Sequence, residues 1–415
     1  MDQKIITLLL DSLHQPPDRV TADRLAVLTR DEWQTLVDLA QEQNVSALVY
    51  HRLKARGLAP ALPPDIQTQL LTAYRHTAVM NLGYAVDLAR IVTLFQANAI
   101  RVIALKGIYL ASEVYGNLAL REMADLDLLV PLNQIEQAAT LLQTLGYKQK
   151  PGVTAEVDVS FSQHLSIFTD SHSSLIELHW TVTRPASSYS IDPSIDPGEL
   201  WARAVPVRIQ TLEVLGLSAE DLLLHLCLHT SYHHRFEFGL RPSCDIAETL
   251  RHFGDRLDWS QIVERARRWH WDRGTYLALR LAKDLVGAAV TDEVLRQLQP
   301  MPCDETIVDA ARSQIFTDQK LMFAISPRLG RLRQAPRLSA IVSELWHAVF
   351  LPKSDLAGLY GVSPHSRFFY FYYLVRLKDT FLKNVKLLFS LWRRDPKLSP
   401  MVQRKTLLLN WLSEK

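Results

Sequence analysis

Two carboxylates stand one residue apart in the stretch REMADLDLLVP, at residues 121–131. Asp125 and Asp127 lie within an otherwise apolar run of the kind that forms a buried strand. Residues two apart on a strand point to the same face of the sheet, so these two side chains project together. Adjacent carboxylates repel each other unless a cation or a shared proton separates their charges. The pair therefore predicts a site for Mg²⁺ or Mn²⁺, because such ions prefer oxygen ligands and usually accompany phosphate.

A third acid lies in SLIELHWTV, residues 174–182, which also has the pattern of a strand. Glu177 taken alone could be a surface residue of a half-exposed strand. Together with the aspartate pair it would complete a set of three acids on two strands, which can hold two metal ions for phosphoryl chemistry. His179 shares the strand face of Glu177, so it either lines the same pocket or is an ordinary packed histidine.

Residues suited to bind phosphate flank the aspartates. Gly107 ends the strand-like run RVIALKG, residues 101–107, and a glycine before a helix lets backbone amides approach a phosphate near the positive end of the helix dipole. Lys106 and Arg121 could bind negatively charged oxygens. For Arg121, a salt bridge to Asp125 or Glu122 is an equal alternative.

The surrounding pattern predicts an α+β fold in which a small mixed sheet lies between two helical regions. We expect an N-terminal helical region over residues 1–98, an α+β domain over 99–185 and a C-terminal helical region over 186–415. Asp31 is the predicted N-cap of an early helix, and another helix restarts after the prolines of ALPPD and continues toward residue 100. In the C-terminal region, Ser218 followed by Asp221 is a capping signal.

The C-terminal region carries a row of histidines. His225, His229 and His233 recur every four residues and would lie along one helical face. This spacing suits zinc, but the sequence offers no clear further ligand, so a substrate-facing wall or a helix interface is the better interpretation. Asp245 could pair with one of these histidines.

Composition narrows the class of protein. Lys and Arg total 46 against 44 acids, so the overall charge gives no argument for nucleic acid binding. Three widely spaced cysteines (Cys227, Cys244 and Cys303) suggest neither disulfides nor a cysteine zinc site, and a reducing cytoplasm is the expected compartment. The N-terminus is typical of an amphipathic helix, and no apolar run approaches the ~20 residues that span a bilayer.

The last fifty residues differ from the rest in charge. Residues 366–415 contain eleven Lys and Arg against three acids, interleaved with the aromatic run FFYFYY. This segment could contact a membrane surface, RNA or a protein partner. The alternative is a helical pair that buries its aromatic residues and exposes its lysines.

The pattern KG…R…DxDLLV…ELHW, with its helical flanks, resembles an uncharacterised nucleotidyltransferase family of the polymerase-β-like superfamily. The resemblance covers most of residues 25–290 and is strongest over 103–131. It implies that Asp125, Asp127 and Glu177 bind metal and align a nucleoside triphosphate, and that Glu177 could also accept the proton of the acceptor hydroxyl. One departure is Ile108, at a position where the superfamily usually has serine or glycine; Lys106 is the plausible substitute for the missing hydroxyl.

We therefore expect a metal-dependent nucleotidyltransferase that moves a nucleotidyl group from a nucleoside triphosphate to a hydroxyl-bearing acceptor and releases pyrophosphate. The acceptor could be a small molecule, a peptide or protein, or RNA, with His179, His225, His229 and Asp245 as candidates for its pocket. A nucleotide-binding scaffold without catalysis is the alternative, and a toxin or immunity component that acts on tRNA or protein is a third. We expect Asp127→Ala to abolish activity and leave the fold intact.

Overall fold

The computed structural model describes residues 2–15, 19–149, 162–171, 174–184, 195–300, 304–317, 350–351, 353–360, 362, 366–379 and 398–414. Several predicted features lie outside these ranges. They are Cys303 and residues 380–397 of the basic C-terminal segment, together with His172 and Ser173, where the sequence has the pattern of a short polar turn, and most of residues 185–197, whose Ser, Pro and Asp content predicts a loop.

The N-terminal region is helical, as predicted. Helix α3 begins after Thr29 and not after Asp31: the Thr29 hydroxyl accepts a hydrogen bond from the Glu32 amide, and the Glu32 carboxylate accepts one from the Thr29 amide. This reciprocal pair satisfies two amides that the helix itself cannot, so Thr29 is the cap. The elements are α1 (Gln3–Leu13), α2 (Ala22–Ala26), α3 (Arg30–Glu42), α4 (Ser46–Ala55), a 3₁₀ turn (Ala59–Ala61) and α5 (Pro64–Ala97).

A seven-stranded mixed sheet forms the centre of the fold, in the order β3-β4-β5-β2-β1-β7-β6. Strand β2 is antiparallel to β1 and parallel to β5. The predicted α+β class is thus confirmed. The strands are β1 (Ile103–Ala104), β2 (Leu126–Leu129), β3 (Lys148–Gln149), β4 (Phe168–Thr169), β5 (Leu175–His179), β6 (Val205–Ile209) and β7 (Leu212–Gly216).

The hairpin of β6 and β7 was not predicted. Strand β7 joins the sheet beside β1, with Ile103 opposite Leu215, so the sheet includes residues beyond the predicted boundary at 185. Gly216 packs closely against Tyr109 and Val207: an added Cβ would lie 3.0 Å from both side chains, so a larger residue would require them to shift. The division into three regions remains a prediction.

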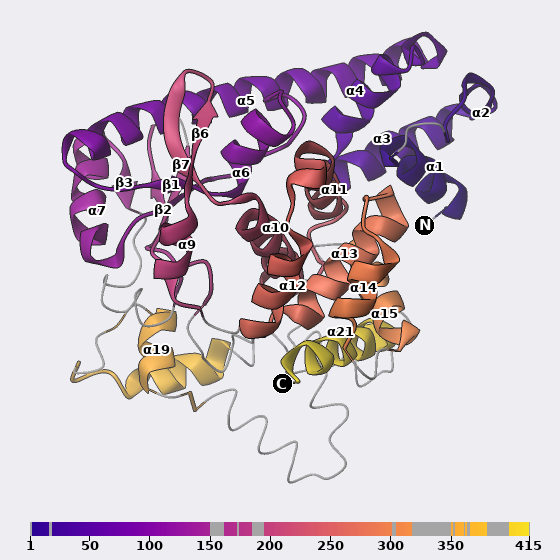
Figure 1. Ribbon diagram of the computed structural model, residues 1–415. Coiled ribbons are helices and arrows are strands. Elements are labelled where there is room, and N and C mark those ends of the chain that lie inside the picture. Colours follow the sequence, from indigo (N-terminus) through magenta and orange to yellow (C-terminus); the bar gives the residue numbers. More distant parts are fainter. Residues whose placement is uncertain are drawn as a thin grey trace, which may run out of the picture.

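Helix α5 fixes the segment that leads into β2. Figure 1 shows this helix extending along the sheet toward the N-terminal helices. Asn81 Nδ2 donates hydrogen bonds to the carbonyls of Leu118 and Arg121, at 2.6 and 2.7 Å, and the Tyr84 hydroxyl donates to the Ala124 carbonyl at 2.7 Å. These buried side chains therefore anchor the irregular backbone directly before Asp125. The other helical elements here are α6 (Lys106–Tyr109), a π-helical turn (Leu110–Val114), a 3₁₀ turn (Leu132–Gln134) and α7 (Ile135–Thr144).

The C-terminal region is a helical bundle that packs beside the N-terminal helices (Figure 1). The Gln15 amide donates to the Val286 carbonyl at 3.0 Å, and Arg52 forms a buried ion pair with Glu248. The predicted cap at Ser218 is confirmed, since its hydroxyl accepts from the Asp221 amide. The helices and turns are α9 (Pro197–Arg203), α10 (Ala219–Leu228), a π-helical turn (His229–His233), α11 (Arg241–Phe253), a 3₁₀ turn (Gly254–Arg256), α12 (Trp259–Arg268), α13 (Asp272–Val286), α14 (Asp292–Leu298), α15 (Glu305–Ile315), α19 (Lys353–Tyr360) and α21 (Leu398–Ser413).

Helix α5 is long and apolar enough to cross a bilayer by length and composition alone. Its most apolar window has a mean hydropathy of 1.4, and 39% of that window is buried inside the protein. One such helix is weak evidence of a membrane span, because the core helix of a soluble fold meets the same criteria. Within the protein, α5 packs against α3, α4, α6 and α7, and it leaves the apolar side chains of Val79, Met80, Leu82 and Val86 exposed.

The basic C-terminal segment divides into two described parts. Helix α21 packs on α15 and buries Leu408 and Trp411 in the main core, and Lys405 forms a buried ion pair with Glu237 at 2.9 Å. The aromatic run FFYFYY instead buries Phe369 in a small separate cluster and leaves neighbours such as Phe368 exposed. The expectation that this segment buries its aromatic residues in the bundle is therefore wrong for most of the run.

Candidate active site

The two acid-bearing strands lie side by side in register. In the parallel pair β2 and β5, Asp127 is directly opposite Glu177, so both side chains project from the same face of the sheet. His179 is two residues farther along β5, on the same face. Ligand atoms of Asp127, Glu177 and His179 all lie within 4.8 Å of one another. No other group of three such residues in the described ranges meets this criterion.

Asp127 is buried between the side chains of Lys106 and His179. Its Oδ2 lies 3.2 Å from Lys106 Nζ, and its Oδ1 lies 2.9 Å from His179 Nε2. His179 Nε2 is also 3.3 Å from Glu177 Oε2 and so bridges the two carboxylates. A second imidazole, His164, has its Nε2 3.6 Å from the same Glu177 oxygen. Lys106 and the two imidazoles therefore offset the acidic charge of Asp127 and Glu177.

The electrostatics of the three acids differ. Burial alone would raise the pKa of Asp127, but Lys106 and the hydrogen bond with His179 outweigh it and hold that pKa well below its usual value. Burial would lower the pKa of His179, yet its hydrogen bonds with Asp127 and Glu177 raise it. Burial and the charge of Asp127 raise the pKa of Asp125 to about 6. Among the described residues Asp125 forms no direct ion pair, and the charges of Lys106 and Arg241 only partly offset the rise in its pKa.

The strand-to-helix junction differs from its predicted form. Gly107 lies inside α6, and an added Cβ would be 3.1 Å from Met123 Sδ and 3.4 Å from an Arg121 nitrogen. The left-handed backbone belongs to Lys106, with φ of 23°. A non-glycine residue held in such a conformation stores strain and is a common feature of functional sites. Gly107 is therefore closely packed against Met123, which would have to shift to admit a larger residue, while Lys106 carries the unusual backbone.

Arg121 has a partner that was not predicted. Its Nε and one terminal nitrogen each lie 2.9 Å from an oxygen of Asp245, and the Tyr115 hydroxyl donates to Asp245 at 2.9 Å. The predicted salt bridge of Arg121 to Asp125 or Glu122 is wrong, because this buried bidentate pair with Asp245 takes its place. The role of Arg121 as a phosphate clamp remains a prediction. The prediction that Asp245 pairs with a histidine is wrong for the same reason. Asp245 joins helix α11 to the segment that precedes β2.

The predicted histidine face is present, but it is not a continuous α-helical face. Helix α10 ends at Leu228, and His229–His233 form a π-helical turn. The ring centroids of His225 and His229 are 6.4 Å apart, and those of His229 and His233 are 5.6 Å apart. Burial, and then the charge of Lys106, hold the pKa of both His225 and His229 well below the usual value. These rings are neutral near pH 7 and lie within electrostatic reach of the acids.

Three residues near the site were missed. His234 Nε2 lies 2.9 Å from His229 Nε2, His164 approaches Glu177, and Arg241 donates to the Glu122 carbonyl at 3.0 Å beside Asp125. His164 begins a predicted strand, so an alternating pattern could have placed it on the face of His179, to which it is bridged. Nothing local in the sequence marks Arg241.

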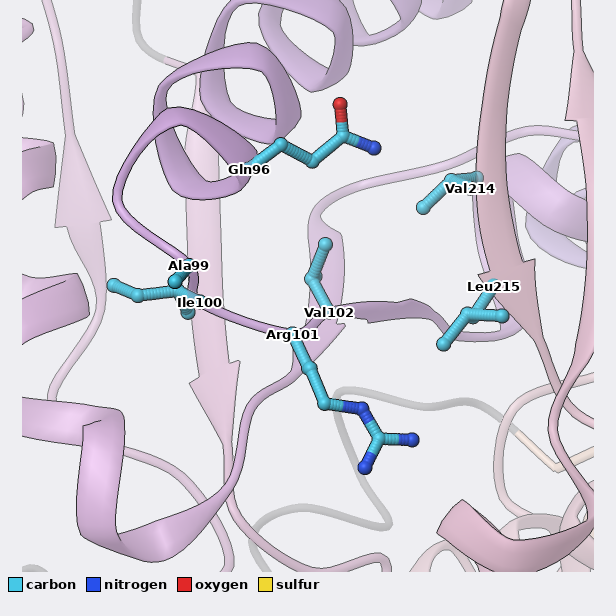
Figure 2. A pocket seen from close by; sticks show the side chains of 7 residues that line it. All are labelled: Gln96, Ala99, Ile100, Arg101, Val102, Val214 and Leu215. Atoms are coloured by element: carbon cyan, nitrogen blue, oxygen red, sulfur yellow. The ribbon is translucent and has the colours of Figure 1, made fainter.

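A surface pocket of about 310 Å³ lies at the other end of β1 (Figure 2). Arg101 and Val102 precede the strand, whereas Lys106 follows it, so this pocket is separate from the acids. The Arg101 guanidinium stacks 4.7 Å from the Trp201 ring. The lining residues are Gln96, Ala99, Ile100, Arg101, Val102, Val214 and Leu215. None of the predicted site residues contributes to it.

Comparison with known proteins gives the class. Residues 29–287 match the sequence profile of a family described as "Uncharacterised nucleotidyltransferase", and this match includes every residue of the candidate site. Since it covers more than half of the chain, the protein belongs to that family and is a transferase of the nucleotidyltransferase class. No curated protein and no solved structure matches the chain significantly.

Proposed function

We propose that the protein transfers a nucleotidyl group from a nucleoside triphosphate to a hydroxyl-bearing acceptor and releases pyrophosphate. The carrying observation is the register that sets Asp127 opposite Glu177, next to Asp125, a further carboxylate whose pKa is raised to about 6. An acid that burial and a neighbouring charge disfavour is the kind of group that a divalent cation stabilises. The family match supports the same chemistry.

Asp125, Asp127 and Glu177 would hold the metal, and their oxygen atoms suit Mg²⁺ or Mn²⁺. When bound, the ion would neutralise phosphate charge and align the α-phosphate for in-line attack. Lys106, which now contacts Asp127, would bind phosphate oxygens as that carboxylate turns to the ion. Glu177, at the rim of the buried set, would accept the proton of the acceptor hydroxyl.

The other predicted residues take supporting roles. Arg121 is held by Asp245, so it would position the Gly107 turn and not contact phosphate directly. The neutral rings of His225 and His229 would form one wall of the acceptor cleft. The acceptor in this proposal is a small molecule, a peptide or protein, or RNA.

A thermal-shift titration of the full chain tests the proposal. Each of the four nucleoside triphosphates is added with and without Mg²⁺ or Mn²⁺. We expect one nucleotide to raise the melting temperature only in the presence of metal. Asp127→Asn should lose this rise. Asp221→Asn is the matched control, because Asp221 is equally buried and also paired with two cations, Arg203 and Arg265, but belongs to no metal group.

The alternative is a nucleotide-binding scaffold without catalysis, and a second assay separates it. After the donor is known, α-labelled nucleotide is incubated with candidate acceptors and pyrophosphate release is measured. Metal-dependent binding without any release would favour the scaffold. No rise with any nucleotide in either metal would contradict both alternatives.

A further inference from the structure

We propose that His179 is itself a metal ligand, which makes this a mixed nitrogen and oxygen centre that binds Mn²⁺ in preference to Mg²⁺. The inference rests on the proposed function, because it requires that the acids bind a metal. It departs from a purely carboxylate site in the identity of one ligand and, as a consequence, in the choice of ion.

The first support is the position of the imidazole. His179 Nε2 lies 2.9 Å from Asp127 Oδ1 and 3.3 Å from Glu177 Oε2. Two ligands bound to one ion at about 2.1 Å each lie about 3 Å apart when they meet at a right angle. The imidazole nitrogen thus lies at this spacing from both carboxylates, and the ligand atoms of all three residues lie within 4.8 Å of one another.

The second support is that the fold holds His179 in this place. The ring is only 2% exposed, and the His179 carbonyl accepts a hydrogen bond from the Val130 amide at 2.8 Å. Glu177 and His179 alternate along β5 with the buried Leu178, so both must face Asp127. Asp125 precedes β2, and its oxygens lie outside the 4.8 Å group that contains His179. The imidazole is thus the third member of the tightest ligand set.

The chemistry of the ligand sets the choice of ion. Mg²⁺ is a hard cation that favours oxygen and keeps much of its water, whereas imidazole is a good ligand for transition ions. Mn²⁺ accepts carboxylates and also binds nitrogen more readily than Mg²⁺ does. When the ion binds, it displaces the proton that His179 Nε2 shares with Asp127, and this proton is released to solvent.

The test uses the full chain with Mn²⁺ alone, in the absence of nucleotide. Pulsed electron paramagnetic resonance of bound Mn²⁺ should show coupling to a directly bound nitrogen, and the signal should change when the histidines are labelled with ¹⁵N. His179→Gln should lose this coupling and weaken Mn²⁺ binding by about tenfold or more, with a smaller effect on Mg²⁺. His164→Gln is the matched control, since His164 is the other imidazole beside Glu177 and should leave the coupling unchanged.

The outcomes separate this inference from the proposed function. Bound Mn²⁺ without nitrogen coupling, or coupling that disappears in His164→Gln, would overturn the role of His179 and leave a metal-dependent transferase intact. No binding of Mn²⁺ would overturn both. If His179→Gln fails to fold, the ¹⁵N experiment on the unaltered protein together with His164→Gln still decides the question.

Discussion

The molecule contains two clusters of charged side chains near the segment that precedes β2, and the two are organised in opposite ways. In the scaffold cluster, both oxygens of Asp245 accept from Arg121, and Tyr115 adds a third hydrogen bond. Each charge therefore has a single, geometrically matched partner. This arrangement satisfies the requirement that a buried ion be fully paired.

In the acid cluster the charges are not matched in this way. Lys106 and His179 both contact Asp127, while Asp125 forms no ion pair within the described residues and has a pKa raised to about 6. The comparison teaches that burial and pairing alone do not identify a functional site. The distinguishing feature is Asp125, a partly buried carboxylate without a direct ion pair, because a cation from outside would stabilise its charged form further.

The largest loss of stability is expected in the scaffold cluster, when the pair between Asp245 and Arg121 is broken. Asp245→Ala leaves the Arg121 guanidinium buried without its partner, and we expect a loss of about 3–5 kcal/mol in the free energy of unfolding. Urea denaturation measures this loss. Asp245→Asn, which keeps a hydrogen-bond acceptor, should cost less. A loss below that of the Asp127 variants would contradict the assignment of this cluster to the scaffold.

Asp127→Ala should have the next largest effect on stability. From the sequence we expected this variant to keep its fold intact, but the structure predicts a loss of stability. Because Asp127 is buried between Lys106 and His179, the alanine variant leaves Lys106 unpaired and should lose about 2–3 kcal/mol. The pKa of Asp127 is lowered well below its usual value in the folded state, so its contribution is complete above the unfolded pKa of about 3.9 and is lost only as the pH falls through the much lower folded pKa. Urea denaturation of both proteins at a series of pH values from 7.5 down to 2 tests this, because the loss caused by the variant should shrink steadily in the acidic part of the series. A loss that stays constant over the whole series would argue against an electrostatic cause.

Asp125→Asn should instead stabilise the metal-free protein. The pKa of Asp125 is about 6 when folded and about 3.9 when unfolded, so the folded state binds more protons between these values and loses stability as the pH rises through them. The penalty is complete above pH 6 and absent below pH 4. We expect a gain of about 1–2 kcal/mol at pH 7.5 and none near pH 4, measured with a chelator present. Destabilisation at pH 7.5 would show that Asp125 is paired like Asp245.

Much of the acid cluster could be predicted from sequence because its signals are local. The apolar runs around Asp127 and Glu177 indicate strands, and period-two spacing gives the face of each acid. What the pattern cannot supply is the register between β2 and β5, which are separated by about fifty residues and pair through the packing of the whole sheet. The contact of His179 with Asp127 follows from that register alone.

The scaffold cluster could not be predicted, because its partners are distant in sequence. Arg121 and Asp245 are 124 residues apart, and neither has a neighbour that marks it as half of a pair. The same holds for the β6–β7 hairpin, which joins the sheet because β7 pairs with β1, a strand far away in the sequence. The sequence singled out Gly107 at the junction after β1, whereas the positive φ belongs to Lys106.

The smallest effect is expected for an ion pair at the surface, and it sets the baseline for the comparison. Arg296 lies 2.6 Å from Glu293, a separation as short as those in the buried clusters, but both side chains are more than half exposed. Water solvates each charge when its partner is removed, so Glu293→Gln should lower the melting temperature by less than about 1 °C. A shift as large as that of Asp245→Ala would mean that pairing itself, and not burial, determines the cost in this protein. A negligible shift would show that the distance between two charged groups does not by itself predict how much their pair contributes to stability.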